Sequence, residues 1–226
     1  MSRALEHGRN EVDLTPLGDR AVLAHFDTER DAALWVAAVR RQAIRGITDV
    51  VLAYQSAAVF ADPDVLDPDM LERELTTIEM RHEAVPESNI LSIPVLYDGP
   101  DLEPVARRLG LAVQELVSLH SGAVYEVYAI GFLQGFPYAG YLPPALCGLP
   151  RREQPRLKVP AGSVAIAGRQ TGIYPRESPG GWHLLGRTPL RIADADAGYF
   201  PIRAGDRIRF HAIDHAEFEA RRDERL

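Results

Sequence analysis

Residues that can bind an anion or move a proton gather in one stretch of the chain, from His120 to Thr188. Arginine offers a bidentate fork for carboxylate or phosphate, glycine lets a backbone approach a ligand closely, and proline makes loops rigid. Residues 131–190 contain 10 of the 18 glycines and 9 of the 17 prolines. Aromatic residues that could wall a pocket lie between them: Phe132, Phe136, Tyr138, Tyr174 and Trp182. The turns and core aromatics of a small barrel would give the same pattern.

The charge of this stretch differs from that of the whole chain. Residues 131–190 hold seven basic and two acidic side chains, a net +5, so the remainder carries −12 of the total of −7. The overall acidity argues against a nucleic-acid or membrane-surface binder. The local positive balance suits a small anionic substrate, a nucleotide phosphate or an acidic face of a partner.

Length and composition favour a folded protein of one or two domains, with 226 residues of which 46% are hydrophobic. A single cysteine, Cys147, excludes an internal disulfide framework and a zinc site built on several thiolates. The first 13 residues are polar and lack the apolar region of a secretory signal, and the apolar runs are too short to span a bilayer. We therefore expect a cytoplasmic protein without a metal site.

Three motifs suggest chemistry that their context does not support. Residues 181–188 (GWHLLGRT) approach a phosphate-binding loop, but the interior is bulky and apolar and Pro189 follows, so a turn entering a strand is favoured. His211 and His215 have helical metal-ligand spacing, yet a solvated pair is favoured because a third ligand is missing nearby. A G-x-S-x-G elbow is absent and Cys147 has no adjacent histidine, so covalent catalysis is unsupported.

The first part of the chain predicts strands and helices in the order β-α-β-β-α-β. Apolar runs indicate strands at 21–26, 47–54, 57–61 and 89–96, and helical spacing of apolar residues indicates helices at 31–44 and 69–81. This order favours one sheet with two helices packed on it.

The second part predicts two short helices and then strands. The helices are expected at 102–109, where Asp101 can cap the first turn, and at 113–120. Short strands between Gly/Pro turns follow, among them 124–130, 164–167 and 207–210, and residues 214–226 form a charged helix or tail. The fold class is therefore α+β, with a small α/β domain at 1–95 and a β-barrel-like domain at 96–226.

Four motifs carry a resemblance to a known family: GFLQGFPYAG (131–140), LPRREQPRLKVPAGSVAIAGRQTGIYP (149–175), SPGGWHLLGRTP (178–189) and GDRIRF (205–210). In these the chain closely resembles the family of KipI, the B subunit of 5-oxoprolinase (PxpB) and allophanate hydrolase subunit 1. The likeness spans about residues 15–213 and is weakest before residue 90. Gln134 and Ala139 replace the family's usual proline and leucine, and His120-Ser121-Gly122 replaces its usual His-[Ser/Thr]-Ser.

The resemblance implies a second domain with a cyclophilin-like β-barrel fold, and a subunit rather than a lone enzyme. The expected partner is a KipA-like protein, of the type of allophanate hydrolase subunit 2 or the C subunit of 5-oxoprolinase, with a lactam-utilisation-type protein as a possible third subunit. Such a complex opens 5-oxoproline to glutamate with ATP, which is the expected cofactor.

Residue types then assign roles for that reaction. His120 is the candidate general acid or base, and Arg156 the candidate cation at the reacting group. Further binding residues are expected at Arg151, Lys158 and Arg187 for anions, and at Gln170, Thr171 and Tyr174 for an amide or carboxylate. A helix-terminal structural role for His120 and plain ion pairs for the arginines are the competing interpretations.

Two other functions remain open at this point. Family members of the KipI type inhibit a histidine kinase, and fused relatives form the carboxyltransferase part of urea carboxylase. The chain has no Met-Lys-Met biotin-carrier sequence, so carboxyl transfer would depend on another protein.

Overall fold

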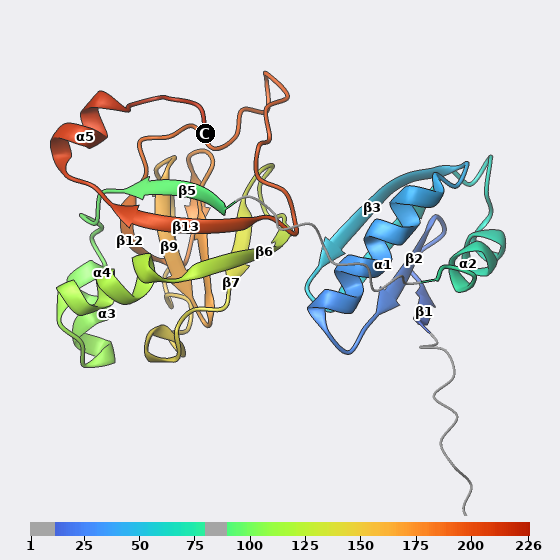
Figure 1. Cartoon of the computed structure of the whole chain (residues 1–226), viewed down its shortest axis with the longest axis horizontal. Coiled ribbons are helices and arrows are strands. Elements are labelled where there is room, and N and C mark those ends of the chain that lie inside the picture. Colours follow the sequence, from blue (N-terminus) through green and yellow to red (C-terminus); the bar gives the residue numbers. More distant parts are fainter. Residues whose placement is uncertain (1–11, 80–89) are drawn as a thin grey trace, which may run out of the picture. The chain divides into compact units, whose positions relative to one another are not determined.

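The structure is a computed structural model that describes residues 12–79 and 90–226. The chain divides into two compact units, 1–85 and 86–226 (Figure 1).

The first unit is an antiparallel sheet with a helix on one face. Its strands lie in the order β1-β2-β4-β3, and α1 crosses the sheet (Figure 1). Thr28 begins α1 by accepting a hydrogen bond from the Asp31 N–H, and Trp35 of this helix is fully buried. The elements are β1 (Asp13–Pro16), β2 (Ala21–His25), α1 (Glu29–Gln42), β3 (Ile47–Ala53), β4 (Ser56–Ala61) and α2 (Pro68–Thr76).

The predicted elements of this unit are confirmed, apart from one helix end. Helix α2 ends at Thr76, earlier than the predicted 81, and residues 80 and 81 lie outside the described residues. A short additional strand, β1, precedes the predicted ones and pairs with β2.

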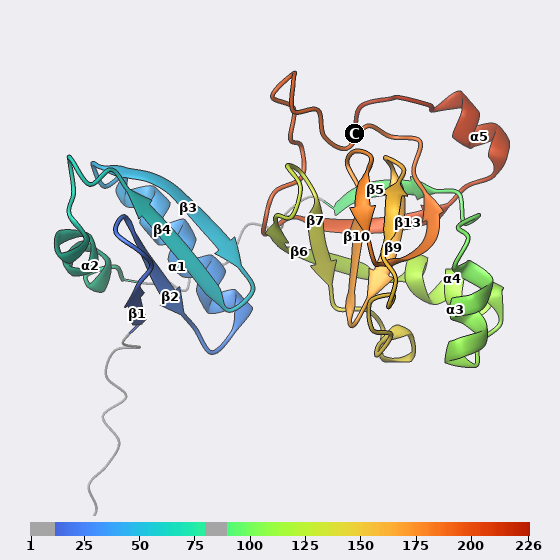
Figure 2. The same cartoon turned by 180° about the vertical axis from the view of Figure 1, so that it is seen from behind.

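The second unit carries the family motifs. Its main sheet has the order β5-β13-β6-β7-β10-β9-β12, in which β13 and β5 are parallel and the other pairs antiparallel. Figure 2 shows β7, β10 and β9 side by side. Strands β8 and β11 form a separate pair. The elements are β5 (Ile90–Val95), α3 (Leu102–Leu109), α4 (Val113–Gly122), β6 (Val124–Ile130), β7 (Pro137–Gly140), the 3-10 turn η1 (Pro144–Leu146), β8 (Arg156–Val159), β9 (Ser163–Ala167), β10 (Gln170–Ile173), β11 (Ser178–Gly180), β12 (His183–Arg187), β13 (Arg207–Ala212) and α5 (His215–Ala220).

The prediction that placed strand 89–96 in the first domain is wrong. Its described part, β5, pairs in parallel with β13 over Ile90–Val95, so it belongs to the second unit and the first unit ends before it. Apolar composition predicts a strand but does not predict which strand it pairs with. The partner here, β13, lies more than 110 residues away.

The two outer strands of this sheet, β5 and β12, come into contact just after the end of β5. Leu96 and Arg187 exchange two backbone hydrogen bonds of 2.9 Å, and the Gly99 and Asp101 N–H groups donate to the carbonyls of Leu185 and Leu184. Gly186 permits this approach, because a Cβ there would lie 2.3 Å from the Leu96 carbonyl oxygen. The contact is a single bridge rather than a strand ladder, so the structure is a mixed fold with a large, mainly antiparallel sheet. The closed cyclophilin-like barrel stays a prediction.

The structure places two of the weak motifs as follows. The loop-like sequence at 181–188 is mostly strand β12. His211 Nδ1 hydrogen-bonds to Ser92 Oγ at 3.0 Å, and the described residues contain no cluster of metal-binding side chains. Within 12–79 and 90–226, none of the helices is both long and apolar enough to cross a membrane.

Candidate functional site

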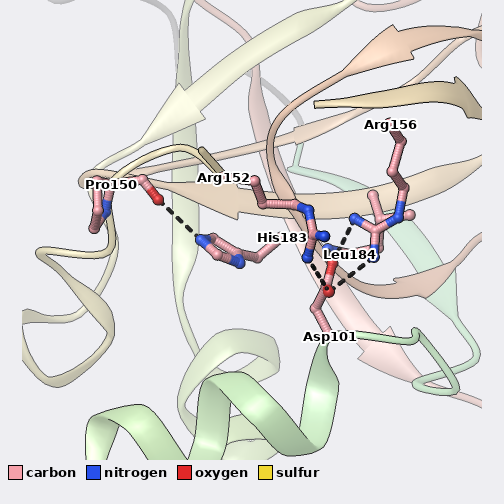
Figure 3. A network of polar contacts seen from close by, with 6 residues as sticks. All are labelled: Asp101, Pro150, Arg152, Arg156, His183 and Leu184. Carbon is pink, nitrogen blue, oxygen red and sulfur yellow. Dashed lines mark hydrogen bonds and ion pairs between the residues drawn. The ribbon is translucent and has the colours of Figure 1, made fainter. Parts of the chain in front are cut away.

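A buried carboxylate, Asp101, organises the motif region. Asp101 lies at the start of α3 and is 4% exposed. Its side chain does not cap the helix as predicted. Instead it accepts hydrogen bonds from Arg156 (Nη1 to Oδ2, 2.9 Å; Nη2 to Oδ1, 2.8 Å), from Arg152 Nη1 (3.0 Å) and from the Leu184 N–H (2.7 Å) (Figure 3). The carboxylate thereby joins α3, the 150–156 loop and β12.

The charge of Asp101 is compensated within this cluster. Burial by itself raises the pKa of a carboxyl group, but the hydrogen bonds from Arg156 and Leu184 and the charges of both arginines bring the pKa of Asp101 below its ordinary value. Asp101 is therefore ionised at neutral pH, and Arg156 is held in a bidentate ion pair.

Two further contacts fix the 150–156 loop. His183 Nε2 donates to the Pro150 carbonyl at 2.9 Å (Figure 3), and the Arg152 N–H donates to the Gly181 carbonyl at 2.8 Å. The loop is held at both ends, so the side chains that it presents have defined positions.

One side of the loop borders a wide groove of about 1210 Å³. Three predicted anion-binding residues, Arg156, Lys158 and Arg187, line it. Arg187 forms a bidentate pair with Asp98, at 2.7 Å between Nη2 and Oδ2, and its guanidinium lies 4.5 Å from the Phe218 ring centroid. Lys158 is the only lysine of the chain and lies 3.2 Å from Glu177, with its side chain 78% exposed.

Other predicted residues line a smaller aromatic pocket of about 230 Å³. Arg151 and Tyr174 contribute to it, together with Phe132, Phe136, Tyr138 and Trp182. The groove and the aromatic pocket are adjacent, because Arg156 of the groove pairs in register with Gly180 of the pocket across β8 and β11.

His120 lies in the core, away from both cavities. Its exposed fraction is 0%, and its ring stacks on Phe210 at 4.6 Å between centroids. Nδ1 lies 2.7 Å from the Tyr97 hydroxyl and Nε2 lies 2.9 Å from Thr171 Oγ1. Because the Thr171 hydroxyl donates to the Ala165 carbonyl, we assign Nε2 as the donor and Nδ1 as the acceptor.

This arrangement argues for a structural role of His120 rather than the predicted acid–base role. Burial lowers the pKa of His120 to about 3, so the ring is neutral near pH 7. Thr171, also fully buried, is its hydrogen-bond partner and lines neither cavity. Gln170 is half-buried on β10, also outside both cavities.

The pairing of Asp98 and Asp101 with the motif arginines was not predicted from the sequence. Asp101 lies 51 to 83 residues from its partners, and Asp98 lies 89 residues from Arg187. In the sequence both belong to a DGPD turn, a pattern that predicts a turn and a helix start.

The chain is similar to proteins of known family. A family model described as "carboxyltransferase domain, subdomain C and D" matches residues 12–200. The B subunit of 5-oxoprolinase from Escherichia coli O157:H7 is 43% identical over 173 residues, covering 75% of this chain and 76% of that one. The protein of the same name from Haemophilus influenzae is 37% identical over 215 residues, covering 88% and 97%.

A solved structure, that of the protein TTHA0988, has a similar fold. It superposes with a TM-score of 0.79 at 40% sequence identity over 87% of this chain. The matched region is only 41% of the TTHA0988 chain, so that protein contains additional polypeptide.

We predict that replacing Asp101 destabilises the second unit in a pH-dependent way. Asp101→Asn removes the charge that Arg152 and Arg156 share, and should lower the free energy of unfolding by about 2–3 kcal/mol near pH 7. Because the folded-state pKa of Asp101 is lowered, its stabilising effect is present above the unfolded-state pKa and is lost as the pH falls through the folded-state pKa. Urea unfolding followed by Trp182 fluorescence in a Trp35→Phe background measures this.

The control for that experiment is Glu103→Gln, which removes an exposed acid from the first turn of the same helix. A variant with Asp101→Asn that unfolds at the same urea concentration as the control, or whose loss of stability does not shrink toward pH 3, would contradict the assigned role.

We also predict that the His120 ring stays neutral from pH 8 down to about pH 4, because burial lowers its pKa to about 3. Nitrogen-15 NMR of labelled histidine measures the tautomer and its titration, and the His120→Asn variant identifies the signal. Titration of this ring between pH 5 and 8 would restore its candidacy as a general acid or base.

Proposed function

The chain belongs to the family of the carboxyltransferase domain, subdomain C and D, together with proteins named as the B subunit of 5-oxoprolinase, and from this we propose that it is a subunit of an ATP-dependent amidohydrolase complex that opens 5-oxoproline to glutamate. The observation that carries the proposal is the likeness to one such B subunit over 88% of this chain and 97% of the relative.

The proposed chemistry needs an activated lactam. An unstrained amide is a poor electrophile, so its oxygen first attacks the γ-phosphorus of ATP, forming an O–P bond and releasing ADP. Water then adds to the activated carbon and the C–N bond breaks, leaving a free amine and an acyl phosphate. A second water releases phosphate and gives glutamate. Each step places negative charge on oxygen, which cations and N–H donors stabilise.

The size and the lining of the groove support the proposal that the nucleotide binds to this subunit. Its size exceeds that of the roughly 300–1,000 Å³ pockets that hold drug-sized ligands, and Arg156, Lys158 and Arg187 line it. Arg156 and Arg187 are already paired with aspartates, whereas Lys158 has only a solvent-exposed partner. We assign Lys158 to the phosphates because an exposed ion pair is readily exchanged for a phosphate.

The proposal also includes partner proteins, because the proposed reaction is carried out by a complex. The relatives are named as subunits, which supports a complex. We propose as partners a KipA-like protein, of the type of allophanate hydrolase subunit 2 or the C subunit of 5-oxoprolinase, and a lactam-utilisation-type protein. We also propose a cyclophilin-like barrel as the finer description of the second unit and a cytoplasmic location, where ATP is supplied.

The proposed function predicts 5-oxoproline-dependent release of ADP when this chain is combined with both partners, and none when any one of the three proteins is omitted. A coupled ADP assay measures the rate. Urea and allophanate replace 5-oxoproline in parallel reactions, and a histidine-kinase autophosphorylation assay tests for inhibition. Absence of 5-oxoproline-dependent turnover with all three proteins present would refute the proposal, and activity in a parallel assay would identify the alternative.

The assignment of Lys158 predicts a selective effect on ATP. Lys158→Met should raise the KM for ATP about tenfold and leave the KM for 5-oxoproline unchanged. Arg107→Met on the exposed face of α3 is the control. Equal KM values for ATP in Lys158→Met and the control would indicate that the nucleotide site lies on another protein of the complex.

A further inference from the structure

The aromatic pocket lies against a packed aromatic cluster. Phe136 and Tyr174, each 1% exposed, and Trp182, 5% exposed, pack edge to face, with the Tyr174 and Trp182 centroids 5.1 and 5.5 Å from that of Phe136. The rings most open to a ligand are therefore those of Phe132, 61% exposed, and the half-buried Tyr138. Tyr138 lies 5.7 Å from Trp182 and forms a further side. Its volume of about 230 Å³ is below the roughly 300–1,000 Å³ typical of drug-sized ligands, so it suits a smaller molecule.

Phe132, an apolar residue at the rim of the pocket, has an unfavourable backbone conformation. Phe132 is 61% exposed and has a φ of +66°, in the left-handed region. A bulky residue in that region costs on the order of 1–3 kcal/mol and persists where the surroundings enforce it. A tight turn does so here, because the Leu133 N–H donates to the Gly131 carbonyl and the Gly131 N–H donates to the Phe136 carbonyl.

The pocket also has a cation. Arg151 is exposed, lines the pocket and belongs to the loop that Asp101 and His183 hold in place. Burial raises the pKa of the Tyr138 hydroxyl, and the nearby Arg151 charge opposes that rise. The Tyr138 hydroxyl therefore stays protonated near pH 7 and is available as a hydrogen-bond donor.

The backbone leaves room beside Arg151. A Cβ on Gly181 would lie 3.7 Å from Pro155 Cγ and 3.8 Å from Arg151 Cβ, at ordinary contact distances and without a positive φ. A side chain at this position would therefore occupy the pocket without straining the chain.

We propose that the aromatic pocket binds the lactam ring of a small cyclic amino-acid-derived carboxylate, with the Arg151 guanidinium pairing with the carboxylate and the Phe132 and Tyr138 rings contacting the ring atoms. The inference rests on the proposed function, from which it takes 5-oxoproline as the ligand. A nucleotide is too large for this pocket. A purely apolar ligand would leave Arg151 without a counter-charge, whereas a ring bearing one carboxylate matches both the walls and the cation.

The two tryptophans allow a direct test. This chain is labelled with 5-fluorotryptophan and assembled with unlabelled partners, so that fluorine NMR reports on Trp182 in the pocket and on buried Trp35 in the first unit as an internal reference. We expect 5-oxoproline to shift the Trp182 signal and leave the Trp35 signal in place. The neutral carboxamide of 5-oxoproline should bind about tenfold more weakly, because it lacks the charge that Arg151 recognises.

Two variants test separately how the Arg151 charge and the space in the pocket contribute to binding. Arg151→Gln should weaken binding of 5-oxoproline about tenfold and leave binding of the carboxamide unchanged, with Arg107→Gln as the control. Gly181→Val should weaken both ligands by filling the pocket. Arg151 is exposed, so its replacement should not impair folding.

The outcomes distinguish this inference from the proposed function. If the complex turns over 5-oxoproline while Trp182 does not respond, or if Arg151→Gln weakens acid and carboxamide equally, the inference is overturned and the proposed function stands. If the complex has no such turnover, the proposed function fails. The pocket assignment then survives only if Trp182 still responds to 5-oxoproline in an Arg151-dependent manner.

Discussion

The arrangement of the second unit depends on neutralising one buried carboxylate. An ionised aspartate out of contact with water is stable only when its oxygens are paired with cations and N–H groups. Asp101 obtains these partners from Arg152, Arg156 and the Leu184 N–H, which come from the 150–156 loop and β12. Arg156, at the end of that loop, lines the groove, and Arg151 and Pro155 line the aromatic pocket. The same ion-pair cluster thus positions residues of both cavities.

The ion pairs of the motif arginines also change how the local positive charge of residues 131–190 is interpreted. The excess of +5 in residues 131–190 was counted along the sequence, whereas in the structure Asp98 and Asp101, just outside that window, pair with Arg187, Arg152 and Arg156. Two of the five excess positive charges are therefore balanced by internal ion pairs that fix geometry. The charges that remain for a ligand include the exposed Lys158 and Arg176 of the groove and Arg151 of the pocket.

Local features were predictable from the sequence, and distant pairings were not. Helix α1 shows its apolar period within a few residues, so it could be predicted at 31–44, two residues from its observed bounds of Glu29 and Gln42 at each end. The partner of β5 and the burial of His120 depend on residues far away in the chain. His120 illustrates the difficulty, because a histidine beside a Ser-Gly helix end has the same sequence whether its ring faces substrate or stacks on Phe210. The positions of Arg151 and Arg156 were predicted as important, but the two cavities that separate their roles were not.

The adjacency of the two cavities is what the proposed reaction requires. Phosphoryl transfer to a lactam oxygen needs the γ-phosphorus and that oxygen within contact distance, so the proposed sites for ATP and for the ring must lie next to each other and open onto each other. Strands β8 and β11 place the two cavities side by side: Arg156 lines the groove, and its register partner Gly180 lines the aromatic pocket. A glycine is needed there, because a Cβ on Gly180 would lie only 2.3 Å from the Tyr174 hydroxyl oxygen and would displace the wall of the pocket. A wide charged groove thus lies next to a small aromatic pocket, which is the placement that the proposed transfer between a nucleotide and a small cyclic acid calls for.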